Sequence, residues 1–188
     1  PHWEGSHYPW HGAICGDIDL IGQRKPLSHY REIVWNRGKR LYMAVRSPRL
    51  TSGDWQPSQW AQSSSKSHWT WPEQLGKEVT IEVYSRHPKV RLYHNDQLIG
   101  EQSCDIEDQF RCSFSTTYEA GALKAEGIND NEVLETFELK TAGPPAAIHL
   151  SPDQSPIRAN GKDLSFIAVE VVDEKGQVCP TSRLDVRY

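Results

Sequence analysis

The chain has 188 residues, a formal net charge of −4 and a pI of about 6.1, and this length favours one or two domains. No basic run indicates a nucleic-acid-binding or acidic membrane surface, and no apolar run is long enough to span a bilayer. The mean hydropathy is −0.67, yet there are seven Trp and seven Tyr, which favours a compact β core or surfaces that stack on sugars.

The first predicted elements are one strand and one helix. Residues 14–20 read as a short buried strand, and Pro26 suits the first turn of the helix that follows. Asn36-Arg37-Gly38 supplies a helix stop. A parallel βα unit cannot stand alone because its strand must be covered on both faces, so residues 1–38 are expected to be the tail of a larger domain. The apolar residues at helical spacing are Leu27, Tyr30, Ile33 and Val34.

The middle of the chain reads as short strands. In residues 79–85, Val79, Ile81 and Val83 alternate inward against Thr80, Glu82 and Tyr84 outward, and Asn95-Asp96 is a two-residue hairpin signal. Residues 47–67 are rich in Ser, Pro and Gln and read as an exposed loop. Turns about every ten residues predict a sandwich of about seven strands over residues 39–142. The predicted strands are residues 41–46, 79–85, 90–94, 97–101, 110–116, 123–128 and 134–139.

A boundary is predicted at Thr141-Ala142-Gly143-Pro144-Pro145. Beyond it, residues 147–150 and 164–172 read as strands, and Asp173-Glu174-Lys175-Gly176 reads as a turn. About 45 residues are too few for a stable sandwich without staples. Residues 143–188 are therefore expected to be the start of a third unit that is cut short.

The cysteines and histidines give no metal signal. None of the four cysteines forms a C-x-x-C pair, and His2, His7 and His11 lack the H-E-x-x-H spacing of a helical metal site. We expect loop histidines, no metal and no cofactor. Cys104 and Cys112 could approach each other across adjacent strands, either as a disulfide or, as is more common, as free buried thiols.

Several motifs in one order carry a family resemblance. They are the run from Gly16 to Arg31, His68-Trp69-Thr70-Trp71-Pro72, the run from Val90 to Gly100, Tyr118-Glu119-Ala120-Gly121, Leu139-Lys140-Thr141-Ala142-Gly143, and the run from Asn160 to Phe166. Together they resemble the C-terminal part of glycoside hydrolase family 2, most closely the β-galactosidases of the Bacteroidetes type. The resemblance covers nearly the whole chain.

The resemblance implies a mainly β fold. An immunoglobulin-like β-sandwich would be preceded by the last βα element of a (β/α)₈ barrel and followed by the start of a second immunoglobulin-like domain. It also implies a retaining glycosidase, whose two catalytic carboxyl groups lie roughly 5–5.5 Å apart. In the family both are Glu at the ends of the fourth and seventh barrel strands, so no catalytic residue is expected in this chain. Asn131-Glu132 matches the family's Asn-Glu dipeptide, but it lies in the sandwich region and reads as a chance match.

The resemblance also implies partners. They are a β-galactoside or another plant or host glycan, bound through the parent barrel, the rest of the parent enzyme, and a second copy in a homo-oligomer. A periplasmic or secreted location is expected on the same ground. Four residues of the first loop would rim the active-site mouth in the parent: Trp3, Glu4, His7 and Trp10.

Other candidates carry two interpretations each. Asp17 and Asp19 share a face of the predicted strand and could act at a barrel mouth, but the preferred interpretation is that they cap turns or pair with Arg24 or Lys25. Four tryptophans are candidates for stacking on sugars. Trp69 and Trp71 would share one strand face as a platform or, as we favour, pack against a neighbouring domain or into the core. Trp55 and Trp60 lie in the polar loop and are better candidates for exposed contacts.

A non-enzymatic carbohydrate-binding sandwich is the second hypothesis. The tryptophan content motivates it, and the barrel-like residues 1–38 argue against it because a free-standing sandwich has no use for them. Within the family, β-glucuronidase and β-mannosidase stay open. No Asn-x-Lys of the kind that holds a sugar carboxylate in β-glucuronidases lies near residues 14–20, which favours a neutral sugar.

Overall fold

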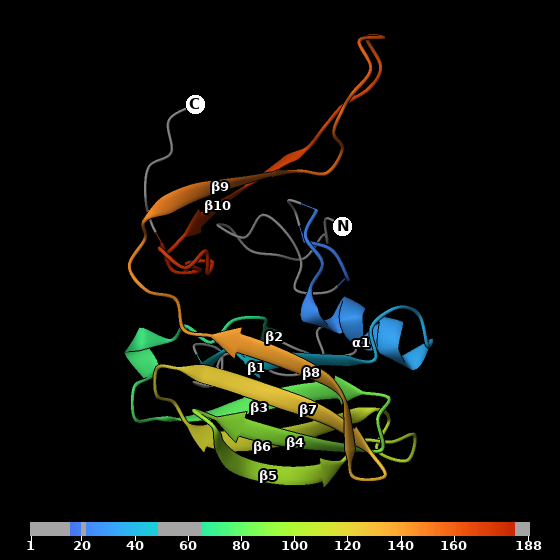
Figure 1. Cartoon of the computed structure of the whole chain (residues 1–188), viewed down its shortest axis with the longest axis vertical. Coiled ribbons are helices and arrows are strands. Elements are labelled where there is room, and N and C mark those ends of the chain that lie inside the picture. Colours follow the sequence, from blue (N-terminus) through green and yellow to red (C-terminus); the bar gives the residue numbers. More distant parts are fainter. Residues whose placement is uncertain (1–15, 20–21, 49–64, 183–188) are drawn as a thin grey trace, which may run out of the picture.

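The chain folds as a β-sandwich with one helix packed on it and a two-stranded ribbon that stands apart (Figure 1). This computed structural model describes residues 16–19, 22–48 and 65–182. The helices are α1 (Pro26–Val34) and the short 3₁₀ helix η2 (Pro72–Gln74). The strands are β1 (Leu41–Arg46), β2 (Ser65–Lys66), β3 (Glu78–Ser85), β4 (Lys89–His94), β5 (Gln97–Ser103), β6 (Arg111–Thr117), β7 (Ala122–Asn129), β8 (Glu132–Lys140), β9 (Ala147–Pro152) and β10 (Ile167–Val172).

The sandwich consists of two antiparallel four-stranded sheets. Their strand orders are β2-β1-β3-β6 and β5-β4-β7-β8. Alternate residues of each strand point between the sheets, so Val79, Ile81 and Val83 of β3 meet Val90 and Leu92 of β4 in one apolar core. This confirms the predicted mainly β sandwich and the inward face of residues 79–85.

Two tight hairpins set the register of the second sheet. Asn95 and Asp96 have φ values of 49° and 63°, and Asp130 and Asn131 have 49° and 67°, as two-residue turns of positive φ require. The predicted Asn95-Asp96 hairpin is confirmed. The Asn131-Glu132 dipeptide spans the second turn and the first residue of β8.

The surroundings of Gly121 explain why the Tyr118-Glu119-Ala120-Gly121 motif ends in glycine. Its φ is 143°, and a Cβ there would lie 1.7 Å from the Asn95 Oδ1 atom. That oxygen accepts a 2.9 Å hydrogen bond from the Ala122 backbone amide. The bare glycine therefore lets the Asn95 side chain fasten the β4–β5 turn to the start of β7.

Helix α1 forms where the sequence predicts it. Pro26 occupies the first turn, and the helix ends at Val34 before Asn36 and Gly38, whose φ values are 53° and 74°. The Arg37 backbone amide donates to the Glu32 carbonyl at 2.8 Å and so closes the last turn. No helix among the described residues is both long and apolar enough to cross a membrane.

The predicted strand over residues 14–20 is described only at 16–19. There Ile18 forms a single antiparallel bridge with Arg24 and is 49% exposed, and residues 16–19 belong to no strand. The buried parallel strand is thus not seen in these four residues. A barrel strand needs a neighbouring strand on each side, and the described part of the chain supplies none.

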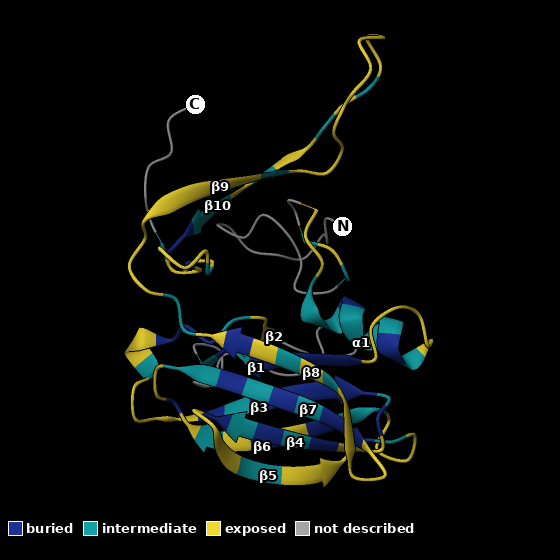
Figure 2. Ribbon diagram, viewed as in Figure 1, coloured by how far each residue is buried: buried dark blue, intermediate teal, exposed yellow. Residues whose placement is uncertain are grey.

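The ribbon of β9 and β10 has one apolar face. Paired residues on that face are Ile148 with Val171, Leu150 with Val169, and Pro152 with Ile167. Leu150 and Ile167 are 57% and 58% exposed, and Figure 2 shows the far end of the ribbon as exposed. An apolar sheet face normally packs on another layer. Within the described part of the chain no second sheet packs on this face. The strand predicted at residues 164–172 begins only at Ile167.

The predicted boundary at residues 141–145 is fastened at both ends. The Thr141 hydroxyl donates to the Trp69 carbonyl at 2.7 Å, and the Ala142 amide donates to the Thr70 hydroxyl at 3.0 Å. On the ribbon side, the Gly143 amide donates to Asp173 Oδ2 at 2.7 Å. These bonds hold the linker at both ends, against the sandwich and against the turn that follows β10.

Candidate functional site

Six predicted sugar-contacting residues lie outside the described residues. These are Trp3, Glu4, His7, Trp10, Trp55 and Trp60. Their roles at a pocket rim or in sugar stacking stay predictions.

The other two predicted stacking residues, Trp69 and Trp71, lie in the sandwich core. Trp69 is fully buried and Trp71 is 8% exposed. The Trp69 ring packs edge-on against Tyr118 with centroids 4.8 Å apart, and the Trp71 amide donates to the Tyr118 hydroxyl at 3.0 Å. Such burial agrees with packing and leaves neither indole a free face for a sugar in this chain.

Asp17 and Asp19 have structural roles. Asp17 forms an ion pair with Arg31 of α1 rather than with Arg24 or Lys25. The Asp19 carboxylate accepts a 2.8 Å hydrogen bond from the Gln23 amide and so caps the turn that leads to the helix. Both residues therefore brace the approach to α1.

Helix α1 packs on the outer face of β1 and β3 through a second apolar cluster, separate from the core between the sheets. We call it the docking interface; its apolar residues are Tyr30, Ile33, Tyr42, Ala44, Tyr84, Phe110 and Phe137. Ile33 and Tyr84 are fully buried. The His29 ring stacks on Tyr42 with centroids 4.1 Å apart, and Tyr30 meets Tyr84 at 5.1 Å. These aromatic contacts pack α1 firmly on the sandwich, and the assignment of residues 1–38 to the tail of a barrel stays a prediction.

Polar groups anchor both sides of the helix. The Tyr30 hydroxyl donates to the Gln109 carbonyl at 2.9 Å. Arg86 Nη1 donates to the Ile33 and Val34 carbonyls, each at 3.0 Å, and its guanidinium lies 4.5 Å from the centre of the Phe110 ring. These carbonyls belong to the last turn of α1, where intrahelical donors run out. The Ile33 carbonyl also accepts from the Asn36 backbone amide at 3.1 Å, so Arg86 adds to that cap and extends it to Val34.

A buried carboxylate lies under the same sheet face. Glu82 is 1% exposed and accepts hydrogen bonds from Ser65, Arg46, Tyr84 and Arg111. Burial raises the pKa of Glu82, but the hydrogen bonds from Ser65 and Arg46, the charge of Arg111 and the Tyr84 hydroxyl outweigh it and lower the pKa to about 2. Enclosed and fully ionised at neutral pH, Glu82 has no proton to donate in catalysis.

The sequence predicts the direction of the side chains on this face but not what covers them. Glu82 and Tyr84 do point away from the inner core, as predicted, yet both are buried. Residues of α1 pack on Tyr84, and the side chains of Ser65, Arg46 and Arg111 enclose Glu82. Ser65 falls in the predicted exposed loop and is likewise buried. The aromatic residues at the outward positions are a signal for this cover. Tyr42 and Tyr84 are large side chains that seldom line up on a face open to solvent.

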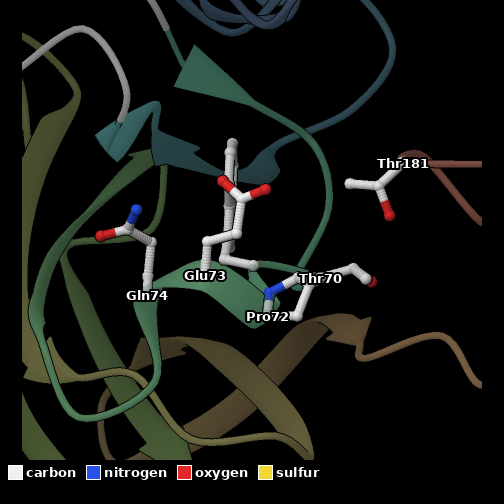
Figure 3. A pocket seen from close by; sticks show the side chains of 6 residues that line it. Thr70, Pro72, Glu73, Gln74 and Thr181 are labelled. Atoms are coloured by element: carbon white, nitrogen blue, oxygen red, sulfur yellow. The ribbon is translucent and has the colours of Figure 1, made fainter.

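A small hollow lies between the sandwich and the residues after β10 (Figure 3). It measures about 10 Å³ and is lined by Thr70, Trp71, Pro72, Glu73, Gln74 and Thr181. That is room for about one water molecule, not for a sugar ring. Among residues 16–19, 22–48 and 65–182, no three His, Cys, Asp or Glu side chains gather as a metal site would need.

Comparisons with known proteins show which family the chain belongs to. Residues 148–188 match the profile of the glycoside hydrolase family 2 C-terminal domain 5, and residues 76–135 match a domain of unknown function, DUF4982. The chain is 37% identical to the β-galactosidase BoGH2A of Bacteroides ovatus over 174 aligned residues, and these make up 92% of this chain. The chain has the sequence and fold of the C-terminal region of a family 2 glycoside hydrolase. This confirms the resemblance predicted from the motifs.

Solved structures agree with this assignment to the family 2 C-terminal region. A family 2 member from Bacteroides cellulosilyticus superposes with a TM-score of 0.80 at 33% identity over 90% of this chain and 22% of its own. A family 2 β-glucuronidase gives a TM-score of 0.67 at 27% identity over 89% of this chain and 15% of its own.

Among sequence relatives, a Formosa agariphila β-glucuronidase is 35% identical over 74% of this chain and 14% of its own length. BoGH2A is matched over 18% of its length. The chain thus spans between 14% and 22% of the length of these four relatives.

Proposed function

We propose that this chain is the C-terminal part of a retaining β-galactosidase and that its role is to complete and brace the catalytic barrel. The observation that carries the proposal is the docking interface. Helix α1 buries Ile33 against Tyr42 and Tyr84 of the sandwich. The last helix of a barrel would make such a contact where the barrel is held against its accessory domain. The 37% identity to a β-galactosidase over 92% of the chain supports the same role.

The catalytic glutamates of the proposed enzyme lie upstream of these residues. The described carboxylates support this because those nearest to α1 already have structural partners: Asp17 with Arg31, Asp19 with the Gln23 amide, and Glu82 with two arginines. On this proposal the chain alone does not hydrolyse glycosides. Trp3, Glu4, His7 and Trp10 would shape the rim of the pocket.

The uncovered ribbon supports a further domain. The apolar face of β9 and β10 is what one layer of an immunoglobulin-like sandwich presents to the other. Residues 148–188 match a family 2 C-terminal domain, so we propose that the remaining strands of that domain cover the face in the longer protein. Export to the periplasm or outside the cell is part of the same proposal.

A second candidate activity is β-glucuronidase, because one relative of that name is 35% identical over 74% of the chain. The residues that select the sugar would lie in the upstream barrel. The test is the kcat/KM of the longer protein on nitrophenyl β-galactoside, β-glucuronide and β-mannoside. Preference for the galactoside supports the proposal, and preference for either other sugar contradicts it.

The carbohydrate-binding hypothesis has its own test. It needs exposed aromatic rings, and Trp69 and Trp71 are buried. The candidates left for it are Trp55 and Trp60, which lie outside the described residues. Replacing both by Ala would abolish binding of galactan to this chain on that hypothesis. If the unaltered chain and the variant bind galactan equally, or if neither binds it, the carbohydrate-binding hypothesis is contradicted.

A further inference from the structure

Two buried thiols meet at the base of one loop. Cys104 follows β5 and is fully buried, and Cys112 lies on β6 and is 6% exposed. Both are free. The Cys104 thiol donates to the Val83 carbonyl at 3.7 Å, and Val83 is the residue directly opposite Cys112 in the pairing of β3 with β6. The topology therefore brings both sulfur atoms to the same point beside β3.

The neighbouring Cys112 is the largest cause that raises the pKa of the Cys104 thiol, ahead of burial and of the negative charges of Asp108 and Asp105. Cys104 is therefore a thiol at neutral pH, while Cys112 is the residue of the pair that keeps some exposure, 6%. The pair is distinct from Cys179, whose thiol contacts the Gly143 and Gln177 carbonyls instead.

The loop between the thiols carries part of the docking interface. We call residues 105–110 the clamp loop. Gln109 and Phe110 both have a φ of 58°, and the Phe110 amide donates to the Asp105 carbonyl at 2.7 Å. The Gln109 carbonyl accepts the hydrogen bond of the Tyr30 hydroxyl, and the Phe110 ring packs against the Arg86 guanidinium. Two consecutive non-glycine residues at positive φ are costly, so the clamp loop depends on restraint at its ends.

We propose that Cys104 and Cys112 form a reversible disulfide that closes the clamp loop and so stabilises the docking of α1. The oxidant is a small or protein disulfide. A Cys112 thiolate attacks one of its sulfur atoms and releases one thiol. The Cys104 sulfur then displaces the second thiol from the mixed disulfide. Each cysteine loses one proton, one S–S bond forms, and the added disulfide takes up two electrons.

The test uses the folded chain in buffer with oxidised glutathione, quenched with acid and mapped by peptide mass after unfolding. We expect Cys104 and Cys112 in one linked peptide, and labelled thiols to fall from four to two per chain. We also expect slower hydrogen exchange in α1 and a thermal midpoint several degrees higher. Both changes should reverse with reduced glutathione.

Three variants separate the steps. Cys104→Ser should stop at a glutathione adduct on Cys112, whereas Cys112→Ser should leave Cys104 unmodified because that thiol is fully buried. Cys179→Ser, the matched loss of a buried thiol outside the pair, should still form the bridge. Linkage that occurs only in denaturant, separate adducts on both cysteines, or two thiols that stay free in the folded chain would each overturn the proposal. If a variant fails to fold, the peptide map of the unaltered chain still decides.

Discussion

The Tyr30 hydroxyl donates a 2.9 Å hydrogen bond to the carbonyl of Gln109, 79 residues further along the chain. This contact joins α1 to the clamp loop at the edge of the sandwich. With the Arg86 cap and the aromatic contacts, it makes the helix a fixed part of the sandwich surface.

Tyr30→Phe keeps the ring and removes only the hydroxyl. The loss of one hydrogen bond should destabilise the folded chain by about 1 kcal/mol and speed hydrogen exchange of the α1 amides. Exchange measured by mass spectrometry checks this. Tyr93→Phe, on a partly exposed tyrosine of β4 beside Lys124, is the control and should leave exchange in α1 unchanged. Equal exchange in the two variants would show that the hydroxyl does not hold the helix.

Arg86→Ala should have a larger effect. It removes two hydrogen bonds to the last turn of α1 and the contact with the Phe110 ring. The Val34 carbonyl loses its side-chain donor, while the Ile33 carbonyl keeps the Asn36 backbone amide at 3.1 Å. We expect a loss of about 2–3 kcal/mol in urea unfolding. Arg91→Ala removes an arginine that pairs with Glu101 away from α1 and should cost less than about 1 kcal/mol. A cost no greater than that of Arg91→Ala would contradict the capping role.

The Glu82 cluster predicts a defined response to acid. The pKa of Glu82 is about 2 in the folded chain against 4.5 ordinarily. Because the folded value is lower, the carboxylate stabilises the fold fully above about pH 4.5, and this contribution is lost as the pH falls through 4.5 toward 2. The difference corresponds to about 3 kcal/mol.

Glu82→Gln tests that response. The neutral amide leaves Arg46 and Arg111 without their shared carboxylate, so the variant should lose about 3 kcal/mol or more at pH 7. Its stability should also change less between pH 4.5 and 2 than that of the unaltered chain. Glu138→Gln, which removes an exposed carboxylate next to Lys140, serves as the control and should keep the steep loss. An equally steep loss in Glu82→Gln would place the acid sensitivity elsewhere.

Gly127→Ala probes the packing of β7. A Cβ at Gly127 would lie 2.2 Å from the ring of His87, which is 3% exposed and paired with Glu135 at 3.0 Å. The ring must shift, at a cost of about 1–3 kcal/mol. Gly100→Ala on β5 of the same sheet meets Phe114 only at 3.7 Å and should be nearly neutral. Thermal unfolding of the two variants checks the contrast, and equal midpoints would contradict it.

Local signals predicted most of the fold. The Asn95-Asp96 turn, the alternation of Val79, Ile81 and Val83, and Pro26 at the helix start each act within a few residues, and the structure has all three. Alternation tells which face a side chain occupies but not what covers that face. The alternation therefore predicts that Tyr84 points outward, which is correct, but not that α1 buries it.

Local sequence patterns could not predict the docking interface, because its residues lie far apart in the sequence. Ser65 reaches Glu82 from a two-residue strand, too short to give a periodic signal, and Arg86 reaches the end of α1 from the end of β3. Trp69 and Trp71 show a related limit. Their spacing allows a sugar platform or a core, and only the packing of Tyr118 against Trp69 distinguishes the two.

The central claim is that this chain completes a barrel whose catalytic glutamates lie upstream. The most direct measurement is hydrolysis of nitrophenyl β-galactoside by three proteins: this chain, the longer protein, and the longer protein cut just before this region. The account predicts activity in the longer protein alone. Activity in this chain would contradict it and would make Glu4, Asp17 and Asp19 the first residues to replace. Full activity in the shortened protein would show that the barrel does not need α1.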